Sequence, residues 1–468
     1  VRMASTRKHV FVNDAAAMGM LSHTLHSQLH EETCRGHLFG HPLFRIIGGM
    51  QERVLSKICS KSACFKVLLP HDELFHSQVL CRDAFQILSG VLSYDDCSHS
   101  FASQFHLRTQ SFDVSRVDNL TPGLERNRWL CWASLWCTWT SMGTCKALES
   151  SEVLVLNADR FSHAVRIYGP ARSLLHAYAA SFVRKIVAAP RLTDLEQHLG
   201  DHREVVWGMS REYQRDISNL ALEALQAQRW RFRLRTKALV KLQSEMVAGK
   251  SILVETQGDD VEVVERVVAL TALKVYRSDG CVLAHLLRIS KEDGMTPWCH
   301  FPATKHRIEG DHLENPQEAV RRLVQESLGV LMTSESSLRI TGPERSDVVE
   351  RSERFRLRTH YMRHIFTAEA GPLEHIPTLK PRGIKRREAS WWKTGSASLL
   401  PKIEDCFLME GPDYSHLCAW VVGEDYLANL RTGAGRRDLF SFAKVVAEVL
   451  KNDCSNRRLT TSQFVRFS

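Results

Sequence analysis

The stretch TCKALESSEVLVLNADRF, residues 144–161, carries the clearest structural signals in the first half of the chain. It holds two short apolar runs, Thr144 to Leu148 and Val153 to Leu156, which have the length and composition of β-strands and are separated by polar turn residues. Asn157 is a favourable N-cap for a helix that follows at once and turns Phe161 inward. The stretch therefore predicts two strands that lead directly into a helix.

Upstream of this stretch the same strand signals recur. Apolar runs lie at Phe65 to Leu69, Ala84 to Leu88 and Val91 to Tyr94, and they are closed by Pro70-His71-Asp72 and Ser89-Gly90. A tryptophan-rich segment, residues 129–139, joins these runs to the quoted stretch. Short strands joined by turn residues predict an antiparallel sheet.

The composition bounds the class of protein. At 468 residues, with 44% apolar and 25% charged residues, the chain is expected to form a globular protein of two or three domains. Its net charge of +9 is a mild basic bias and gives no strong nucleic-acid signal. The 13 cysteines form no Cys-x-x-Cys pair, which argues against a disulfide framework or a zinc site and favours the cytoplasm.

The chain also lacks an apolar run long enough to cross a bilayer. It begins at Val1 rather than Met, so we expect it to be a piece of a longer product.

The order of the first elements resembles the cyclic-nucleotide-binding domain of cyclic-nucleotide-gated and hyperpolarization-activated channels. The resemblance runs from His41-Pro-Leu-Phe44 and a helix, through the strands and Gly90, to Val153–Leu156 and the helix with Phe161. It implies an antiparallel, jelly-roll-like β-roll with lid helices over residues 41–169, preceded by a helical linker over residues 1–40. It also implies that the chain is the cytoplasmic part of an ion channel, at the inner membrane face, with the pore region as its partner.

In that family a short cassette binds the ligand: backbone N–H groups at a helix start and an Arg face the cyclic phosphate, and a Glu holds the ribose. The resemblance places this cassette at Cys131, Trp132, Ala133, Ser134, Ser141, Met142, Gly143 and Thr144. The Arg position falls on Ser141 or Met142 and the Glu position on Cys131 or Trp132, so both charged partners are replaced. Two interpretations stay open: an altered site for a cyclic nucleotide or another nucleotide-like small molecule, and a site filled by the indole side chains.

After the β-roll the pattern becomes helical. Apolar residues at helical spacing predict a helix over residues 175–186, ended by Pro190, and a longer helix over residues 212–247. We interpret residues 170–248 as a helical connector, residues 249–455 as a mixed α/β domain and residues 456–468 as a tail.

Within the mixed domain, periodicity predicts strands at residues 261–276, 282–289 and 418–422, a loop at 298–302 and a helix at 438–450. A further strand is expected at residues 355–361, with Arg354, Arg356, Arg358 and His360 on its wet face.

The clearest motif of this domain is Glu314-Asn-Pro-Gln-Glu-Ala-Val-Arg-Arg322, continued by Glu326 and Gly329. Its Pro near the start, its early Glu318 and its closing Gly predict a helix from Pro316. The motif and the strands before it resemble a Nudix domain. The resemblance implies an α/β/α sandwich that hydrolyses nucleoside diphosphates linked to another moiety, with Mg²⁺ held by Glu314 and Glu326.

This sequence departs from the Nudix pattern at the metal-binding residues. Leu323 and Ser327 stand where two glutamates would be, and Ala303-Thr304 stands where the loop has glycines. Glu326 alone of the helical carboxylates remains, which is too few for a magnesium site. We therefore expect no catalytic residue and favour a non-enzymatic regulatory or interaction protein.

Two alternative functions stay open. One is a Nudix-type hydrolase with a regulatory β-roll, for which Glu309 and Asp311 are the only close replacement ligands. The other is a purely structural adaptor in which both folds are relics.

Overall fold

The computed structural model describes residues 22–96, 123–124, 126–227, 236–256, 264–290, 294–309, 312–328, 339–352, 354–370, 406–410, 415–433 and 435–444. The chain divides into two compact units, each described below by itself. The first comprises Val1–Met246, Ile252–Arg266 and Arg354–Arg358, and the second comprises Val247–Ser251, Val267–Glu353 and Thr359–Ser468. The helices expected as a connector at residues 170–248 thus fall almost entirely within the first unit.

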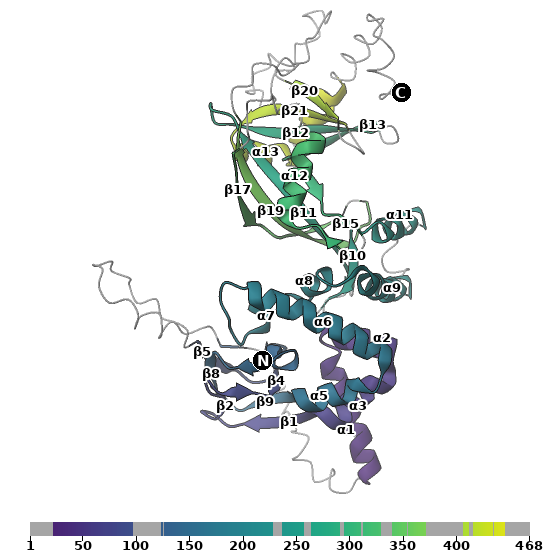
Figure 1. Cartoon of the computed structure of the whole chain (residues 1–468), viewed down its shortest axis with the longest axis vertical. Coiled ribbons are helices and arrows are strands. Elements are labelled where there is room, and N and C mark those ends of the chain that lie inside the picture. Colours follow the sequence, from purple (N-terminus) through teal and green to yellow (C-terminus); the bar gives the residue numbers. More distant parts are fainter. Residues whose placement is uncertain are drawn as a thin grey trace, which may run out of the picture. The chain divides into compact units, whose positions relative to one another are not determined.

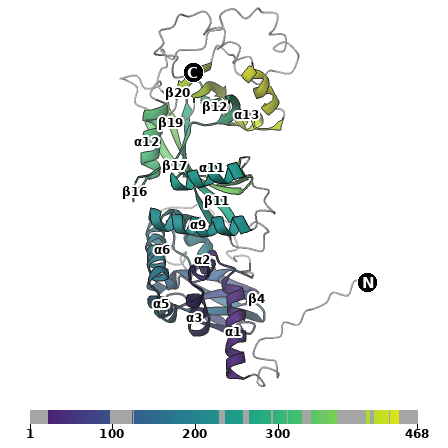
Figure 2. The same cartoon turned by 90° about the vertical axis from the view of Figure 1, so that its right-hand side faces the viewer.

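The first unit begins with the helices α1 (His23–Leu38), α2 (Pro42–Met50) and α3 (Glu52–Ser62). The side chain of Ser22 caps α1, and His41 caps α2 by accepting a hydrogen bond from the N–H of Leu43. Helix α3 lies beside both α1 and α5 (Ala158–Arg166), as Figure 2 shows.

Short antiparallel strands lie to one side of the helices α1, α2 and α3 in the first unit (Figure 1). They are β1 (Ala63–Leu68), β2 (Glu73–Phe75), β3 (Leu80–Cys81), β4 (Asp83–Ser89), β5 (Leu92–Asp96), β6 (Trp129–Leu130), β7 (Trp139–Thr140), β8 (Gly143–Ala147) and β9 (Ser151–Asn157). The strands pair in the orders β1-β9-β4-β6, β2-β8-β5 and β3-β7. The predicted strands of the quoted stretch are confirmed as β8 and β9, and Asn157 caps α5 as expected.

Gly90 shows why the turn after β4 needs glycine. Its φ is +85°, and a Cβ at this position would lie 2.7 Å from the Cα of Ser151 on β9. Only glycine tolerates both the left-handed backbone and this close approach.

Helices complete the first unit. They are the 3₁₀ turn η2 (Trp132–Leu135) and the helices α6 (Gly169–Ala188), α7 (Glu196–Leu199), α8 (His202–Trp207), α9 (Arg211–Ala227) and α11 (Thr236–Val247). The long helix predicted over residues 212–247 is described as α9 and α11, and residues 228–235 lie outside the described part. A strand, β10 (Ile252–Glu255), follows and pairs with β11.

The second unit is built on an antiparallel sheet with the order β17-β19-β11-β12-β21-β20. Its elements are β11 (Val264–Tyr276), β12 (Cys281–Ser290), β13 (Gly294–His300), β14 (Ala303–Lys305), β15 (Ile308–Glu309), β16 (His312–Leu313), α12 (Pro316–Ser327), β17 (Arg339–Arg345), β18 (Val348–Arg351), β19 (Arg358–Glu369), β20 (Cys406–Glu410), β21 (Ser415–Val422) and α13 (Glu424–Leu430).

Two apolar layers lie on the two faces of this sheet. Leu283 of β12 packs with Val320 and Leu323 of α12, whereas its neighbour Val282 packs with Leu427 of α13. Successive residues of β12 therefore point to opposite faces of the sheet and pack against different helices. Figures 1 and 2 both show α12 lying against strands of the sheet.

The coarse prediction of a multidomain α+β chain with antiparallel sheets is confirmed. Two local predictions in the second half are wrong. The loop expected at residues 298–302 is partly strand, because Trp298 to His300 end β13. The strand expected from Phe355 begins only at Arg358, since Arg356 has a φ of +54°, and His360 is buried beside Asp347 rather than wet.

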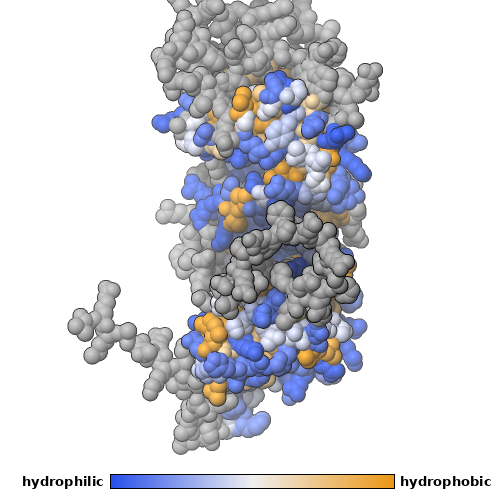
Figure 3. All heavy atoms as spheres, turned by 90° about the vertical axis from the view of Figure 1, so that its left-hand side faces the viewer, coloured by the Kyte–Doolittle hydropathy of each residue, from blue (hydrophilic) through white to orange (hydrophobic). Residues whose placement is uncertain are grey.

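The helix expected at residues 438–450 is described up to residue 444, where Leu439 and Phe442 are buried. Within the described residues, none of the helices is both long and apolar enough to span a membrane. On the face drawn in Figure 3, apolar residues among the coloured atoms are scattered in small groups between polar ones.

Candidate functional site

A buried carboxylate lies at the centre of the first unit, beside the predicted ligand cassette. Asp194 belongs to the segment after α6, and its side chain is 0% exposed. Its Oδ2 accepts hydrogen bonds from the backbone N–H groups of Met142 and Gly143, at 2.8 and 2.9 Å, and from the hydroxyl of Tyr94 at 2.9 Å. Its Oδ1 accepts a hydrogen bond from the indole of Trp139 at 2.7 Å. Four donors therefore converge on one anion.

The residues around Asp194 fix its position on the sheet. The backbone N–H of Cys131 donates to the carbonyl of Asp194 at 2.8 Å, and Leu195 forms a β-bridge with Leu130 at the end of β6. Glu196 follows and contacts the imidazole Nε2 of His41 at 2.8 Å. Residues 193–196 form one short segment beside the cassette. It is held by contacts with the cassette strands on one side and with α2 on the other.

The electrostatics of this site reflect burial. Burial raises the pKa of Asp194 above its ordinary value, although hydrogen bonds from Trp139, Gly143 and Tyr94 oppose the shift. The pKa of Tyr94 is raised as well, by burial and then by the nearby Asp194 carboxylate, so its hydroxyl stays protonated and donates. A buried anion needs such donors, because an unpaired charge in the interior is costly.

The structure divides the predicted ligand residues into two groups. Met142 and Gly143 meet Asp194 through their backbone N–H groups, as described above. The hydroxyl of Ser141 instead lies within hydrogen-bond distance of the carbonyls of His76 and Val79, and the hydroxyl of Thr144 accepts from the N–H of Ser77. Ser141 and Thr144 therefore bind the turn between β2 and β3 rather than Asp194.

Of the remaining predicted residues, Cys131 precedes η2, and Trp132, Ala133 and Ser134 belong to it. Cys131 has a φ of +50°, and its thiol lies 3.7 Å from Oδ1 of Asp194. Trp132 is 0% exposed; its indole packs 4.4 Å from the His41 ring and 6.0 Å from the Phe44 ring, measured between centroids. Ala133 and Ser134 are buried behind it. The Trp132 indole fills the core on the side of this turn that faces α2.

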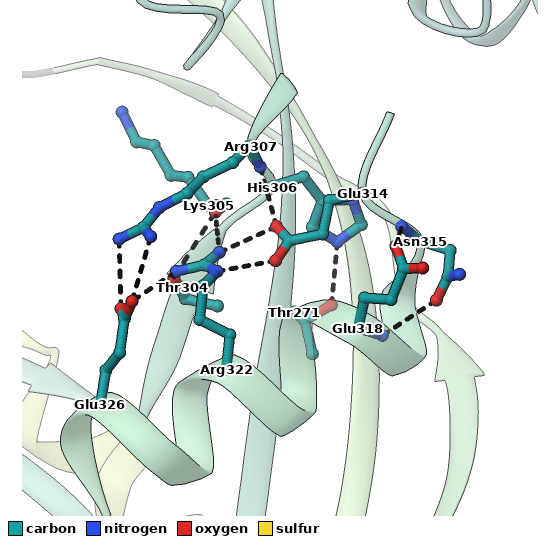
Figure 4. Close-up of polar contacts among 10 residues, drawn as sticks. All are labelled: Thr271, Thr304, Lys305, His306, Arg307, Glu314, Asn315, Glu318, Arg322 and Glu326. Atoms are coloured by element: carbon teal, nitrogen blue, oxygen red, sulfur yellow. Dashed lines mark hydrogen bonds and ion pairs between the residues drawn. The ribbon is translucent and has the colours of Figure 1, made fainter. Parts of the chain in front are cut away.

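A second polar site lies on α12 of the second unit (Figure 4). The guanidinium of Arg322 binds Glu314 in a bidentate manner, with Nε 2.7 Å from Oε1 and Nη2 2.9 Å from Oε2. It also donates to the Thr304 hydroxyl and the Lys305 carbonyl, at 2.9 and 2.8 Å. Burial alone would raise the pKa of Glu314, but hydrogen bonds from Arg322 and from the Arg307 N–H lower it below its ordinary value. Glu314 is therefore a carboxylate held by a guanidinium.

The other predicted metal ligand, Glu326, is also paired with arginine. Both nitrogens of the Arg307 fork approach it, at 3.0 and 3.1 Å, and Arg322 lies 3.4 Å away. Glu318 reaches back to the N–H of Asn315 and so completes the capping box of α12. The carboxylates that the described part of the motif presents are thus engaged with protein donors.

These residues do not fit a Mg²⁺ ion. Such an ion needs several oxygen ligands in nearly octahedral geometry, and positive guanidiniums beside the carboxylates repel it. Leu323 is 2% exposed in the apolar layer under α12, so it offers no ligand. Within the described ranges, no group of three or more His, Cys, Asp or Glu residues is placed to hold a metal. Asp311, the side chain of Glu309 and Gly329 lie outside the described residues.

Sequence reasoning predicted Met142, Gly143, Glu314 and Glu326 but missed Asp194, Trp139 and Arg307. Asp194 follows the cassette by about fifty residues, so no local spacing connects them. The one available signal was an acidic residue inside an apolar Leu-Thr-Asp-Leu stretch after Pro190.

Comparisons with known proteins give a partial likeness. No family model matches the chain, and no curated protein matches it. Among solved structures, the chain is similar to a cyclic nucleotide-binding-like protein from Brucella abortus, with 19% identity and a TM-score of 0.19 over 26% of this chain and 97% of the other. It is also similar to the C-linker/CNBHD of zELK channels, with 12% identity and a TM-score of 0.24 over 35% of this chain and 76% of the other.

A second crystal form of the zELK fragment matches with 10% identity and a TM-score of 0.18 over 24% of this chain and 53% of the other. All three TM-scores are low. The three neighbours, each matched over part of this chain, are cyclic-nucleotide-binding-like domains. The properties of the site are argued only from this chain's own contacts.

Proposed function

We propose that the chain is a non-enzymatic regulatory protein whose first unit is a cyclic-nucleotide-binding-like β-roll that carries its own anion in place of a ligand. One observation carries the proposal: the Asp194 carboxylate accepts from the N–H groups of Met142 and Gly143, two residues of the predicted cassette. Backbone N–H pairs of this kind also bind phosphate oxygens. A nucleotide would have to displace a buried, fully hydrogen-bonded carboxylate.

The second unit is proposed to be a Nudix-like scaffold without metal-dependent hydrolysis. Its support is the pairing of Glu314 and Glu326 with Arg322 and Arg307, which occupies both carboxylates that the resemblance assigns to metal binding. Under this proposal the chain acts by binding other molecules or proteins. A role as the cytoplasmic, channel-associated part of a membrane protein remains part of the proposal, and it rests on the family resemblance.

Isothermal titration of cyclic AMP and cyclic GMP into the full chain tests the first part. We expect no binding by the unaltered protein. The informative variant combines Asp194→Ala with Met142→Arg, because Met142 is half-buried at the position of the family's arginine and the first change removes the competing anion. We expect cyclic nucleotide binding to appear in this double variant and not in Met142→Arg alone.

The outcomes separate the parts of the proposal. Micromolar binding by the unaltered protein would show that the site is a working nucleotide sensor, and the self-occupied site would be wrong. A folded double variant that still binds nothing would contradict the assignment of residues 131–144 as a ligand cassette. Trp132→Glu is a poor restoring change, because that position is fully buried against His41 and Phe44.

A further inference from the structure

A cluster of basic and aromatic side chains lies on one face of the second unit, apart from both sites described above. Three imidazoles form a row across adjacent strands: His300 on β13 is the register partner of His285 on β12, and His416 on β21 stacks on His285. The ring centroids of His285 and His416 are 4.3 Å apart, with the planes inclined by 20°. Cross-strand partners share a face of a sheet, so the three rings point the same way.

A β-bulge adds a guanidinium to this face. The pairing of β12 shifts between His285 and Leu287, after which Arg288 lies opposite His416. A bulge re-aims the residues that follow it, so Arg288 joins the histidines although it is three residues further along. The Arg288 guanidinium lies 4.5 Å from the centroid of the Trp298 ring, and Trp298 is 4.9 Å from the ring of His300.

Arg431, at the end of α13, supplies a second guanidinium. Its Nε donates to the Cys299 carbonyl at 2.8 Å, and its Nη2 lies 3.3 Å from Nδ1 of His300. These contacts fix the guanidinium beside the imidazole row. Within the described ranges, neither Arg431 nor any of the three histidines has a carboxylate partner.

The cluster is partly buried and incompletely satisfied. His285 is 3% exposed, and its Nε2 has no hydrogen-bond partner in the described part of the chain. A buried polar nitrogen without a partner costs about 1–3 kcal/mol. By contrast, His300, Trp298 and Arg431 are exposed, so the row can be reached from solvent. The fold thus holds an unsatisfied donor or acceptor behind an accessible basic rim.

Like charges crowd this face. Burial, then Arg431 and Arg363, lower the pKa of His300 to about 4, and the Arg431 guanidinium lies 3.3 Å from its ring. The pKa of His416 is lowered to about 4 by burial and by Arg288, and that of His285 is lowered by burial, His416 and His300. Burial and Arg431 lower the pKa of Arg363, against the opposing effect of the nearby carboxylates Glu350 and Asp347.

We infer that His285, Arg288, Trp298, His300, His416 and Arg431 form a binding site for a small, multiply charged oxyanion. Guanidinium forks match the geometry of phosphate and carboxylate oxygens, and imidazoles become good donors when an anion is near. A metal ion is the wrong occupant, because the neighbouring guanidiniums repel it and no metal-binding group of residues is present in the described ranges. Trp298 gives the ligand an apolar surface at the rim.

Phosphate esters and polycarboxylates share this chemistry, and the experiment distinguishes them. Inorganic phosphate and citrate are titrated separately into the full chain by calorimetry. We expect one of them to bind, and the tighter of the two identifies the ligand class. We also expect proton uptake near pH 6, measured in buffers of different ionisation enthalpy, because a bound anion raises the pKa values of His300 and His416.

The variants locate the site. We expect Arg431→Gln and His300→Gln each to weaken binding by about ten-fold or more, equivalent to the loss of one charge-assisted hydrogen bond. Arg431→Gln keeps a donor for the Cys299 carbonyl, so it is chosen to preserve the fold. Arg339→Gln, at an exposed arginine of β17 outside the cluster, is the matched control and should bind as the unaltered chain does.

Three results would overturn the inference. They are the absence of binding by either anion, binding that is equally strong in Arg431→Gln and His300→Gln, and binding without proton uptake. Because nucleotide binding to the first unit is tested by a different titration, failure here leaves the proposed function untouched.

Discussion

The two candidate sites are opposite in charge and alike in arrangement. In the first unit, neutral donors of the chain surround an anion that the chain itself supplies, Asp194. In the second unit, anions of the chain, Glu314 and Glu326, are held by cations that the chain also supplies, Arg322 and Arg307. Under the proposed function, each internal group takes the place of a ligand of the same sign. Under the same proposal, each site keeps its electrostatic balance without a bound ligand.

The two sites differ in burial, and burial sets how much each internal partner contributes to stability. Asp194 is fully buried, the side chains of Glu314 and Arg322 are 11% and 15% exposed, and that of Arg307 is 40% exposed. The loss of stability on substitution should be largest at Asp194, smaller at Arg322 and smallest at Arg307. The reason is that water replaces a lost contact only where it can enter.

The largest effect is expected at Asp194. Asp194→Asn keeps the shape but turns an amide N–H toward either Trp139 or the N–H groups of Met142 and Gly143, so donors face one another. We expect the free energy of unfolding of the first unit to fall by about 3 kcal/mol. Chemical denaturation measures it, with the exposed Asp159→Asn as the control, which should change stability by less than about 0.5 kcal/mol. A variant as stable as the control would mean that the four hydrogen bonds are not formed.

The next effect separates the two arginines of the second site. Arg322→Ala leaves Glu314 partly buried without its bidentate partner and removes the donors to Thr304 and Lys305, so we expect a loss of about 2–3 kcal/mol. Arg307→Ala removes a more exposed partner and should cost about 0.5 kcal/mol or less.

Arg322→Lys serves as the matched control for charge. It keeps the positive charge but cannot form the fork, so an intermediate loss of stability is expected. Equal losses for Arg322→Ala and Arg307→Ala in denaturation experiments would contradict the role of burial.

The sequence predicted the second site better than the first, for a physical reason. Residues of α12 interact at helical spacing, so Asn315, Pro316 and Glu318 predicted the start of the helix. Glu314 and Arg322 lie within the same short motif. Asp194 contacts Met142 and Gly143 across a chain separation of about fifty residues. Closing so long a loop leaves no periodic mark in the sequence, and only the folded chain brings the two segments together.

The tryptophans show the same limit. One interpretation left open by the sequence was a site filled by the indole side chains, and Trp132 and Trp139 are indeed buried. Yet spacing did not reveal that Trp139 donates to Asp194 while Trp132 packs on His41. Burial can be read from composition, whereas the partner of a buried polar atom depends on distant residues.

A smaller effect concerns acidity in the second site. His306 is 3% exposed, its Nε2 lies 2.9 Å from the hydroxyl of Thr271, and burial and His364 lower its pKa to about 4, against the opposing effect of Glu314. A lowered histidine pKa means that the unfolded chain binds the proton first. The stability contributed by neutral His306 is therefore complete above about pH 6.5 and is lost as the pH falls toward 4.

We expect the second unit to lose about 2 kcal/mol between pH 7 and pH 4.5 through this residue. His306→Gln should remove that part of the pH dependence in denaturation experiments. The Glu314 carboxylate, whose pKa is lowered, stabilises the fold fully above its ordinary pKa of 4.5, and that stability is lost only as the pH falls below this value, so the two losses fall in different pH windows. An unchanged slope in His306→Gln would rule out this residue as the cause.

The smallest effect tests whether the internal cations truly replace a metal. Millimolar Mg²⁺ should leave the melting temperature of the unaltered chain unchanged, because Arg307 and Arg322 already neutralise Glu326 and Glu314. Removing the Arg307 charge with Arg307→Gln and adding a carboxylate with Ser327→Glu should create weak affinity. A ligand present at a concentration equal to its Kd stabilises the folded state by only about 0.4 kcal/mol. Arg307→Gln alone is the control. Its melting temperature should not respond to Mg²⁺, because Glu326 is then still the one helical carboxylate available to bind the ion. Stabilisation of the unaltered chain by Mg²⁺ would instead show that the guanidiniums give way to the ion, and the second unit would then have to be tested again as a metal-dependent hydrolase.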